Sequence, residues 1–418
     1  MTTTEPIIIL GQAPGYGVLV GLGSLFAIGM ILITKALSRY LHEDANSTEN
    51  FMVSNRSINK WFMANSAYSS WSWANELLFV STNVYLYGVQ CSLYYLMGLC
   101  IQLAAMNLIG VHSKKKVPTA HTSLEIIEIR YGKITHIVFI FFCLATNLLS
   151  CCTMILSAAS AISIIAGNLH IVAATMLIPL GVLIYTTFSG LKGTFITDFA
   201  HTLVLLIVLC YINTAVLSSE KVGGLNNLWT RVTEAAKDKY IEGNYEGSFL
   251  TGKSENGFIF ALVLTIGNFG LTISDSSFWQ KSFSARPEAT FPGYLTASIA
   301  ILSNAWSIGA ILGSATLFLE NDPSFPTYPR KMTEYEIASG FPLPYIVKAT
   351  LGKHAVGGLL LIIYLSVTST VSAQMISVSS IISYDIYKKY VKPKANNKQV
   401  IRISHLSVVA FGFFAAGF

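Results

Sequence analysis

The chain has 418 residues, of which 53% are hydrophobic and only 11% are charged, with a formal net charge of +6. Its apolar residues form long blocks, which exclude a soluble multidomain protein and indicate a polytopic membrane protein. The six cysteines lie mostly within these blocks and lack metal-ligand spacing, so neither a disulfide framework nor a zinc site is expected. The sequence contains no nucleotide-binding loop and no hydrolase motif, which argues against an ATP-driven pump and against an enzyme.

Ten hydrophobic segments predict the membrane spans. About 20 apolar residues suffice for a helix to cross a bilayer. The segments lie at residues 17–37, 61–88, 91–111, 134–166, 169–188, 198–218, 257–279, 291–319, 356–384 and 402–418. We therefore expect residues 1–418 to form a single transmembrane domain.

The basic residues predict the orientation of these spans. If the N-terminus lies outside, 18 of the 27 Lys and Arg residues fall on the cytoplasmic side and 9 outside. Basic residues in short loops favour the cytoplasmic side, so this is the expected orientation. The basic runs are interpreted as topology determinants rather than as a binding patch, and no nucleic-acid partner is indicated. The cytoplasmic linkers are then residues 38–60, 112–133, 189–197, 280–290 and 385–402, and the two long outer loops are residues 219–256 and 320–355.

The second span carries polar side chains at mid-membrane depth. Its segment SAYSSWSWANELLF (66–79) alternates small polar residues with Trp71 and Trp73. Such a pattern suits an interrupted helix whose freed carbonyl groups face a cavity. A carboxylate at this depth, Glu76, costs about 2.5–3.5 kcal/mol on insertion scales unless it is paired or hydrated. Glu76 is therefore either a functional-site residue or a structural hydrogen-bond partner of another helix.

The seventh span contains a matching interruption signal, Gly267-Asn268-Phe269-Gly270, in the opposite orientation. Two glycines so close together lower helix stability. Broken helices at corresponding places in oppositely oriented halves indicate a secondary transporter with inverted repeats. The alternative is ordinary packing, because glycine and serine are common in packed transmembrane helices. Asp198 and Asp275 are expected at membrane edges, either solvated or paired with a nearby lysine.

The ninth span carries a line of small polar residues within LSVTSTVSAQMISVSSIISYDIY (365–387). These residues recur at spacings of three or four, so they share one helix face. They are Ser366, Ser369, Thr370, Ala373, Ser377 and Ser380. Two interpretations stay open. The face is either a stripe for close helix packing, or the oxygens of Ser366, Ser369 and Thr370 form part of a site for a small hard cation.

Taken together, these segments resemble the sodium/solute symporter family, and within it the fungal urea active transporters. The resemblance extends from about Gln12 to Phe418, essentially the whole chain. Besides SSWSW and GNFG, it is carried by NSTENFMVSNRSI (46–58), PTAHTSLEIIEIRYGKITH (118–136), ATNLL (145–149), SGLKGTFITDFAHT (189–202), PSFPTYP (323–329) and TSTVSAQMISVSSIISYDIY (368–387).

The resemblance implies an all-α, LeuT-like five-plus-five inverted-repeat bundle preceded by one extra N-terminal helix. Residues 61–88, 257–279 and 356–384 would be its first, sixth and eighth core helices. Because Phe418 falls within the ninth core helix, the second repeat is expected to be incomplete in this chain.

The resemblance also implies two sets of site residues. The family's sodium site would combine the carbonyl groups of Ser69, Ser72 and Ser366 with the hydroxyls of Ser369 and Thr370. The substrate site would lie between the first and sixth core helices. Its candidate residues are Trp71, Ser72, Trp73, Asn75, Glu76 and Asn268.

The function implied is a plasma-membrane symporter for urea or a similar small polar solute. Its coupling ion is H⁺ or Na⁺, with no other cofactor, and its partners are this small molecule and the lipid bilayer. Two residues depart from the urea branch, which usually has a small polar residue at Glu76 and a glutamate at Gln374. A symporter for a polyamine or another cationic solute, with Glu76 as counter-ion, therefore stays an alternative. A passive facilitator or a non-transporting sensor is a third.

Overall fold

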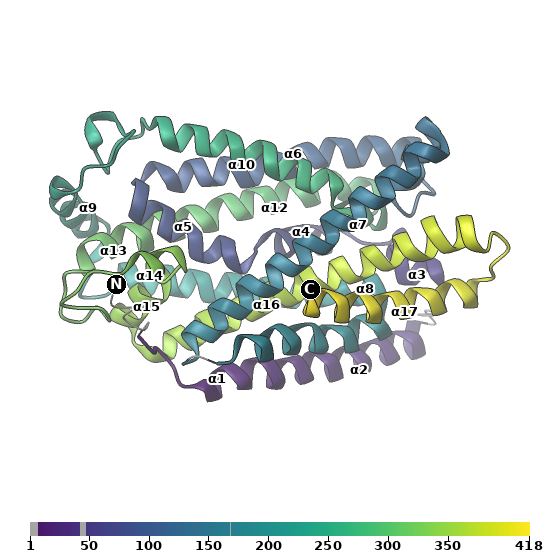
Figure 1. The fold of residues 1–418 in the computed structure, drawn as a ribbon, viewed down its shortest axis with the longest axis horizontal. Helices are drawn as coiled ribbons and strands as arrows, with labels where there is room; N and C mark the ends of the chain where they lie inside the picture. Colours follow the sequence, from purple (N-terminus) through teal and green to yellow (C-terminus); the bar gives the residue numbers. More distant parts are fainter. Residues whose placement is uncertain (1–6, 42–46, 168) are drawn as a thin grey trace.

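The computed structural model describes residues 7–41, 47–167 and 169–418, which are helical apart from loops and two isolated bridges. The helices run roughly along the long axis of the molecule (Figure 1). Those of the first half are α1 (Gln12–Tyr16), η1 (Gly17–Leu22), α2 (Gly23–Leu41), α3 (Thr48–Val53), η2 (Ser54–Arg56), α4 (Lys60–Trp71), α5 (Ala74–Tyr87), α6 (Gln90–Lys116), α7 (Ser123–Ile165) and α8 (Ile171–Leu217). Those of the second half are α9 (Gly224–Ala235), η3 (Ala236–Asp238), η4 (Tyr245–Gly247), α10 (Glu255–Ser274), α11 (Ser276–Ser284), α12 (Pro287–Ser307), η5 (Ile308–Gly313), α13 (Ser314–Leu319), α14 (Glu334–Ala338), α15 (Pro342–Leu351), α16 (Lys353–Ser380), η6 (Ile381–Val391) and α17 (Asn397–Gly417).

Eight helices in the described part of the chain are long and apolar enough to cross a membrane. The difference from the ten predicted spans has two physical reasons. The span predicted at 61–88 is divided into α4 and α5, each too short to count. The spans predicted at 169–188 and 198–218 both lie in α8, which turns at Gly190. The assignment of ten spans stays a prediction, since length and composition alone place no membrane.

Gly190 allows α8 to change direction beside α3. Its φ of +58° lies in the left-handed region that favours glycine. A Cβ atom at this position would also lie 2.7–3.0 Å from Phe51 atoms, so any larger residue would displace α3. This turn starts the second half of α8, which carries Asp198 into the bundle.

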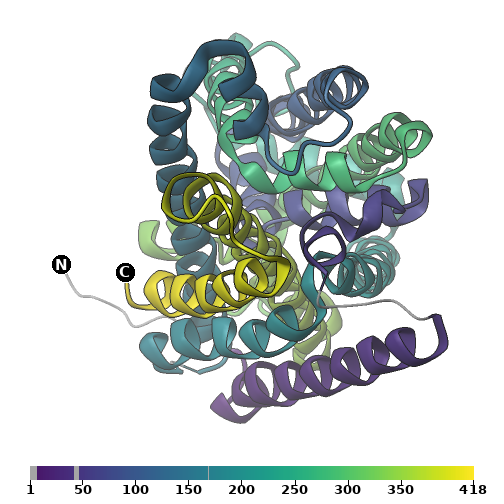
Figure 2. The ribbon, with the colours of Figure 1, turned by 90° about the vertical axis from the view of Figure 1, so that its right-hand side faces the viewer.

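The centre of the bundle is α16. Within the most apolar 18-residue segment of α16 and η6, 78% is buried inside the protein. In the corresponding segment of α10, only 17% is buried. This core helix contacts α4, α7, α8 and α17, and α2 packs on α8 at the edge of the bundle (Figure 2). The polar face predicted on residues 366–380 is therefore buried against other helices rather than exposed to lipid.

Two helices are broken inside the bundle. The first break lies at Ser72 and Trp73, between α4 and α5, as the sequence predicts. The second break was predicted at Gly267–Gly270, and this position is wrong, because α10 continues unbroken to Ser274. Glycine costs only about 1 kcal/mol in a helix, so the helical hydrogen bonds persist there. The break falls at Asp275, whose side chain accepts a hydrogen bond from the Ser277 amide at 2.8 Å and caps α11.

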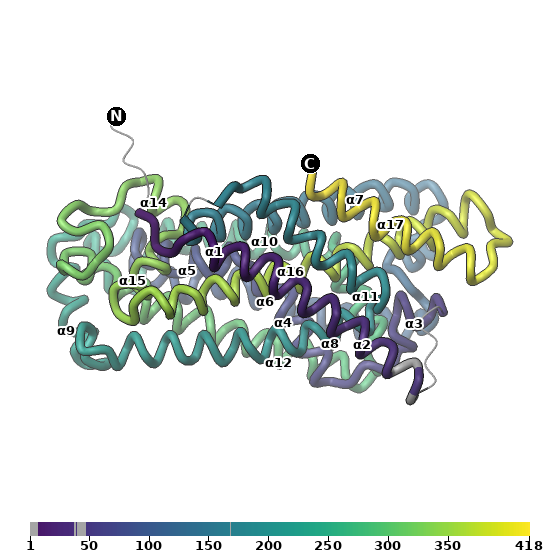
Figure 3. The backbone as a smooth tube through the Cα atoms, turned by 90° about the horizontal axis from the view of Figure 1, so that it is seen from below, coloured from purple at the N-terminus to yellow at the C-terminus, as the bar shows by residue number. Residues whose placement is uncertain are grey.

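The two ends of the bundle differ. The helices α9, α13, α14 and α15 gather at one end, whereas α3 and the turn from η6 to α17 lie at the other (Figures 1 and 3). The two long loops predicted outside, residues 219–256 and 320–355, thus share one end of the molecule. The predicted linker 38–60 includes residues 42–46, which lie outside the described ranges.

Candidate functional site

The break after α4 exposes backbone oxygens to the centre of the bundle. The Ser72 amide makes the last helical bond, to the Tyr68 carbonyl at 3.0 Å, and Ser72 then leaves the helical region with ψ +75°. Because Trp73 is extended, the carbonyl of Ser69 has no amide partner one turn later. It instead faces the Thr370 hydroxyl of α16, with Oγ1 at 3.5 Å from the carbonyl oxygen.

Four of the five predicted cation-site residues meet at this point. Ser69 donates its hydroxyl to Ser369 Oγ at 2.6 Å, and Thr370 Oγ1 lies 3.2 Å from the Ser366 carbonyl. All four are nearly fully buried. Oxygen ligands of this kind suit a small hard cation. The contribution of the Ser72 carbonyl stays a prediction, while the Ser72 hydroxyl donates to the Tyr68 carbonyl at 2.9 Å and lines a separate cavity. That a cation binds here stays a prediction.

Asp198 adds a negative charge to this oxygen cluster. Its carboxylate accepts hydrogen bonds from the hydroxyls of Ser369 and Ser66 and lies 3.2 Å from Lys281 Nζ. The side chains of Asp198 and Lys281 are both completely buried. Of the two alternatives for Asp198, solvation is therefore wrong and pairing with a lysine is confirmed, whereas its place at a membrane edge stays a prediction. The turn at Gly190 allows the pairing, because it starts a new helical segment two turns before Asp198.

The sequence predicted a lysine as one possible partner of Asp198 but did not identify Lys281, although a signal that Asp198 faces the protein interior was present. Polar residues recur at helical spacing along the second half of α8, at Thr194, Thr197, Asp198 and His201. Such a stripe in an apolar helix faces the protein interior rather than lipid. Asp275 is also buried rather than solvated, and its second carboxylate oxygen accepts a hydrogen bond from Gln374 Nε2 at 2.7 Å.

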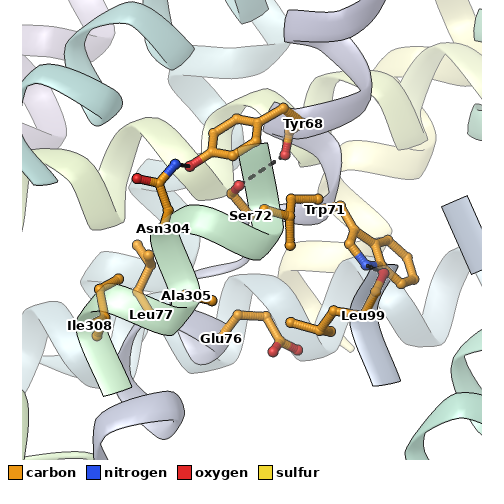
Figure 4. Close-up of a pocket in the computed structure, with 10 residues that line it drawn as sticks. Tyr68, Trp71, Ser72, Glu76, Leu77, Leu99, Asn304, Ala305 and Ile308 are labelled. Carbon is orange, nitrogen blue, oxygen red and sulfur yellow. Dashed lines mark hydrogen bonds between the residues drawn. The ribbon is translucent and has the colours of Figure 1, made fainter. Parts of the chain in front are cut away.

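A small cavity of about 30 Å³ lies on the other side of the α4–α5 break. This volume has room for roughly two water-sized groups. Its polar side chains come from Tyr68, Ser72, Glu76 and Asn304, with apolar side chains between them (Figure 4). The full lining is Tyr68, Trp71, Ser72, Glu76, Leu77, Leu99, Ile301, Asn304, Ala305 and Ile308.

Glu76 is the only charged side chain in this lining. Tyr95 forms a hydrogen bond with its carboxylate. The second oxygen, Oε2, is buried and has no hydrogen-bond partner among the described residues. Asn304 holds the opposite part of the lining in place, because its Nδ2 donates to the Tyr68 hydroxyl at 3.1 Å (Figure 4). An unpaired buried carboxylate oxygen is costly, so a ligand that donates a hydrogen bond to it gains binding energy.

The other predicted substrate residues lie outside the cavity or are already engaged. The indole N–H of Trp71 donates to the Leu99 carbonyl and that of Trp73 to the Ser70 carbonyl, both at 2.8 Å. Both indole N–H groups are therefore already donated in this conformation, and the assignment of Trp71 and Trp73 to the substrate site stays a prediction. Asn75 is half-buried on α5 and does not line the cavity. Asn268 donates to the Gly98 carbonyl at 2.9 Å and does not line it either.

The chain matches the Sodium:solute symporter family over residues 51–416. It belongs to this family. A Na⁺-coupled sialic acid symporter, solved in a substrate-bound outward-open state, has the same fold, with a TM-score of 0.75 and 16% identity. The alignment covers 96% of this chain and 81% of that symporter. This likeness confirms the predicted all-α, LeuT-like fold.

Three transporters from fungi and rice are more similar to this chain in sequence than the sialic acid symporter is. The chain is 38% identical over 410 residues to probable urea active transporter 1 of Schizosaccharomyces pombe, and 37% identical over 410 residues to the urea active transporter of Saccharomyces cerevisiae. Both alignments cover 98% of this chain, and they cover 61% and 56% of those relatives. The rice (Oryza sativa subsp. japonica) urea-proton symporter DUR3 is 33% identical over 422 residues, covering 97% of this chain and 57% of that protein. The chain thus spans less than two thirds of the length of these relatives.

Proposed function

We propose that the protein is a secondary active transporter for urea or a similar small polar solute, coupled to H⁺ or Na⁺. The observation that supports this most is the small cavity that Ser72, Glu76 and Asn304 line at the break between α4 and α5, in a chain similar to urea transporters along nearly all its length. Urea has four N–H donors and one carbonyl acceptor. The carboxylate of Glu76, the hydroxyl of Ser72 and the side-chain carbonyl oxygen of Asn304 supply acceptors for these donors, whereas both N–H hydrogens of Asn304 are already donated, to the Tyr68 hydroxyl and to the Ala300 carbonyl.

The proposed transport cycle alternates access to this cavity from the two ends of the bundle. Broken helices suit such a cycle, because their halves pivot about a fixed site. The cation site between α4 and α16 would then couple ion binding to movement of α4. Since Ser69 and Ser72 lie within one turn of each other, occupation of the cation site changes the shape of the substrate cavity.

A symporter for a cationic solute is the second candidate. The unpaired Oε2 atom of Glu76 favours it, because an ammonium group would donate to this oxygen and neutralise its charge. The cavity of about 30 Å³ would take such a head group but not the whole chain of a polyamine.

The experiment that tests the proposal is uptake of ¹⁴C-labelled urea by cells that express the protein. Accumulation above the external concentration, abolished by a protonophore or by removal of sodium, would support it. Equilibration without accumulation would identify a passive facilitator instead. Absence of urea uptake together with accumulation of labelled putrescine would identify a cationic-solute symporter, and absence of both would point to a sensor.

The proposed location is the plasma membrane, with the N-terminus outside. The basic residues support this orientation, although Lys114 and Lys281 are buried and leave 16 rather than 18 on the cytoplasmic side. Cysteines introduced at Ser113 and Gly243 test it in intact cells. A membrane-impermeant thiol reagent is expected to label only the cysteine at position 243 from outside. Labelling of the cysteine at position 113 from outside would reverse the orientation.

A further inference from the structure

Lys281 places a positive charge beside the candidate cation site. It lies on α11, the second half of the broken sixth core helix, and its side chain is completely buried. Its ammonium group has three hydrogen-bond donors. They are directed to the Ser66 carbonyl at 2.9 Å, to the Ser70 hydroxyl, and to Asp198 Oδ2 at 3.2 Å. Lys281 therefore fastens α11 to α4 and α8 at once.

Asp198 connects this ammonium group to the oxygens predicted to bind a cation. One of its oxygens, Oδ2, faces Lys281, and the other, Oδ1, accepts the hydroxyl hydrogen of Ser369. Ser369 in turn accepts from Ser69, next to Thr370. The carboxylate of Asp198 therefore contacts both the ammonium group of Lys281 and the hydroxyl of Ser369, one of the predicted cation ligands.

The charge of this carboxylate is already neutralised by Lys281. The other acidic group that acts on Lys281 is Asp275, which is itself occupied by the Ser277 amide and by Gln374. A cation entering between Ser69, Ser369 and Thr370 would meet Asp198 in its paired state. Two positive charges beside one buried carboxylate repel each other strongly, because little water screens them.

We propose that the ammonium group of Lys281 is a tethered cation that competes with the transported cation for Asp198. Binding of the transported cation draws the carboxylate towards Ser369 and releases Lys281. The release loosens α11 from α4 and α8, and loss of the cation restores the contact. The inference rests on the proposed function, since it assigns to Lys281 the role of linking ion binding to the movement of a broken helix.

Equilibrium binding of ²²Na⁺ to the purified protein tests this competition without requiring transport. We expect Lys281→Gln to bind sodium at least about fivefold more tightly than the unmodified protein, because coupling between neighbouring binding events is typically 5–150-fold. Unchanged or weaker binding by a folded Lys281→Gln protein would overturn the proposal, as would absence of sodium binding in both proteins.

The matched control is Lys114→Gln. Lys114 is also buried and also holds α11, since its Nζ lies 3.2 Å from the carbonyl oxygens of Ser282 and Phe283, but it has no hydrogen bond to Asp198. We expect its removal to leave sodium affinity unchanged. An equal gain in both variants would mean that loosening α11, rather than removing a competing charge, raises the affinity, and would also overturn the proposal.

Lys281→Arg serves if the glutamine variant does not fold. It keeps the charge beside Asp198, and the guanidinium holds a carboxylate with two hydrogen bonds. We expect it to weaken sodium binding by about fivefold, and equal or tighter binding would count against the proposal. Sodium binding that follows these expectations in a protein without urea uptake would refute the proposed function alone. Urea uptake with no sodium effect in any variant would refute this inference alone.

Discussion

The two buried carboxylates beside the α4–α5 break have contrasting surroundings. Asp198 accepts hydrogen bonds from two hydroxyls and is paired with Lys281. Glu76 has Tyr95 as its partner, and its Oε2 atom has none within the described part of the chain. A buried charge is tolerated where partners replace water, and it is costly where they do not. The comparison teaches that Asp198 holds the bundle together in this conformation, whereas Glu76 leaves a polar position open for a ligand.

The largest expected effect is a loss of stability when the ion pair of Asp198 and Lys281 is broken. Asp198→Asn leaves the ammonium group of Lys281 buried without its ion-pair partner, and removal of one partner of a buried ion pair typically costs about 3–5 kcal/mol. We expect a clear fall in the melting temperature of the detergent-purified protein, measured by thermal unfolding. The double variant Asp198→Asn/Lys281→Gln should recover much of this loss. A melting temperature of Asp198→Asn equal to that of the unmodified protein would show that the pair carries little of the stability.

A smaller effect is expected from the hydroxyls between Asp198 and the cation position. Ser369→Ala with Thr370→Ala removes two oxygen ligands while leaving both charges in place. If sodium drives transport, the concentration for half-maximal uptake should rise about tenfold, which corresponds to about 1.4 kcal/mol. If protons drive transport, the effect should be small.

Thr368→Ala is the control for this double variant. Among the described residues, its hydroxyl bonds only to carbonyl groups of its own helix, at 3.0 and 3.1 Å, so sodium dependence should not change. A shift caused by Thr368→Ala as large as that of the double variant would assign the effect to packing of α16 instead.

Glu76→Gln tests the role of the incompletely paired carboxylate. It keeps the shape of the side chain and removes its charge. If Glu76 carries a proton during the cycle, urea uptake should lose its pH dependence while urea binding persists. This is the outcome that we expect. If Glu76 is a counter-ion, cationic solutes should be lost selectively and urea uptake spared. Uptake measured between pH 5 and 8 with labelled urea and labelled putrescine separates the two, and normal behaviour in both assays would leave Glu76 a structural residue.

The features of these two sites could be predicted from the sequence to different extents. The first helix break and the cluster of Ser366, Ser369 and Thr370 could be predicted from residue spacing, whereas the bundle and the meeting of Ser69 with Ser369 and Thr370 were implied by the resemblance to the family. A lysine partner for Asp198 could be predicted as one alternative, but its identity as Lys281 could not, since the pair joins residues 83 positions apart and the turn at Gly190 sets the course of the segment that carries Asp198. The second break was misplaced because glycine is only a weak helix breaker, whereas the capping carboxylate of Asp275 decides where α11 begins.

The smallest expected effect lies outside the membrane-spanning helices, where Glu336 is a third, fully satisfied carboxylate. Arg330 binds it through two hydrogen bonds of 2.7 and 2.8 Å, and Tyr345 donates to it at 2.8 Å. Burial raises its pKa, but the hydrogen bonds from Arg330, from the Thr333 amide and from Tyr345 outweigh burial, so the pKa of Glu336 lies below its usual value of 4.5. The unfolded loop therefore binds a proton more readily than the folded one. The stabilisation is fully present above pH 4.5 and is lost as the pH falls through the lower folded pKa.

We accordingly expect the loop at residues 320–355 to become more sensitive to an acid-active protease as the pH falls below 4.5, with a loss of about 1 kcal/mol or less. Glu336→Gln should make cleavage nearly independent of pH, because it removes the group that titrates. Glu334→Gln, on the exposed face of the same short helix, is the control and should retain the pH dependence of the unmodified protein. Cleavage that rises equally in Glu336→Gln and in the unmodified protein as the pH falls would assign the effect to another group.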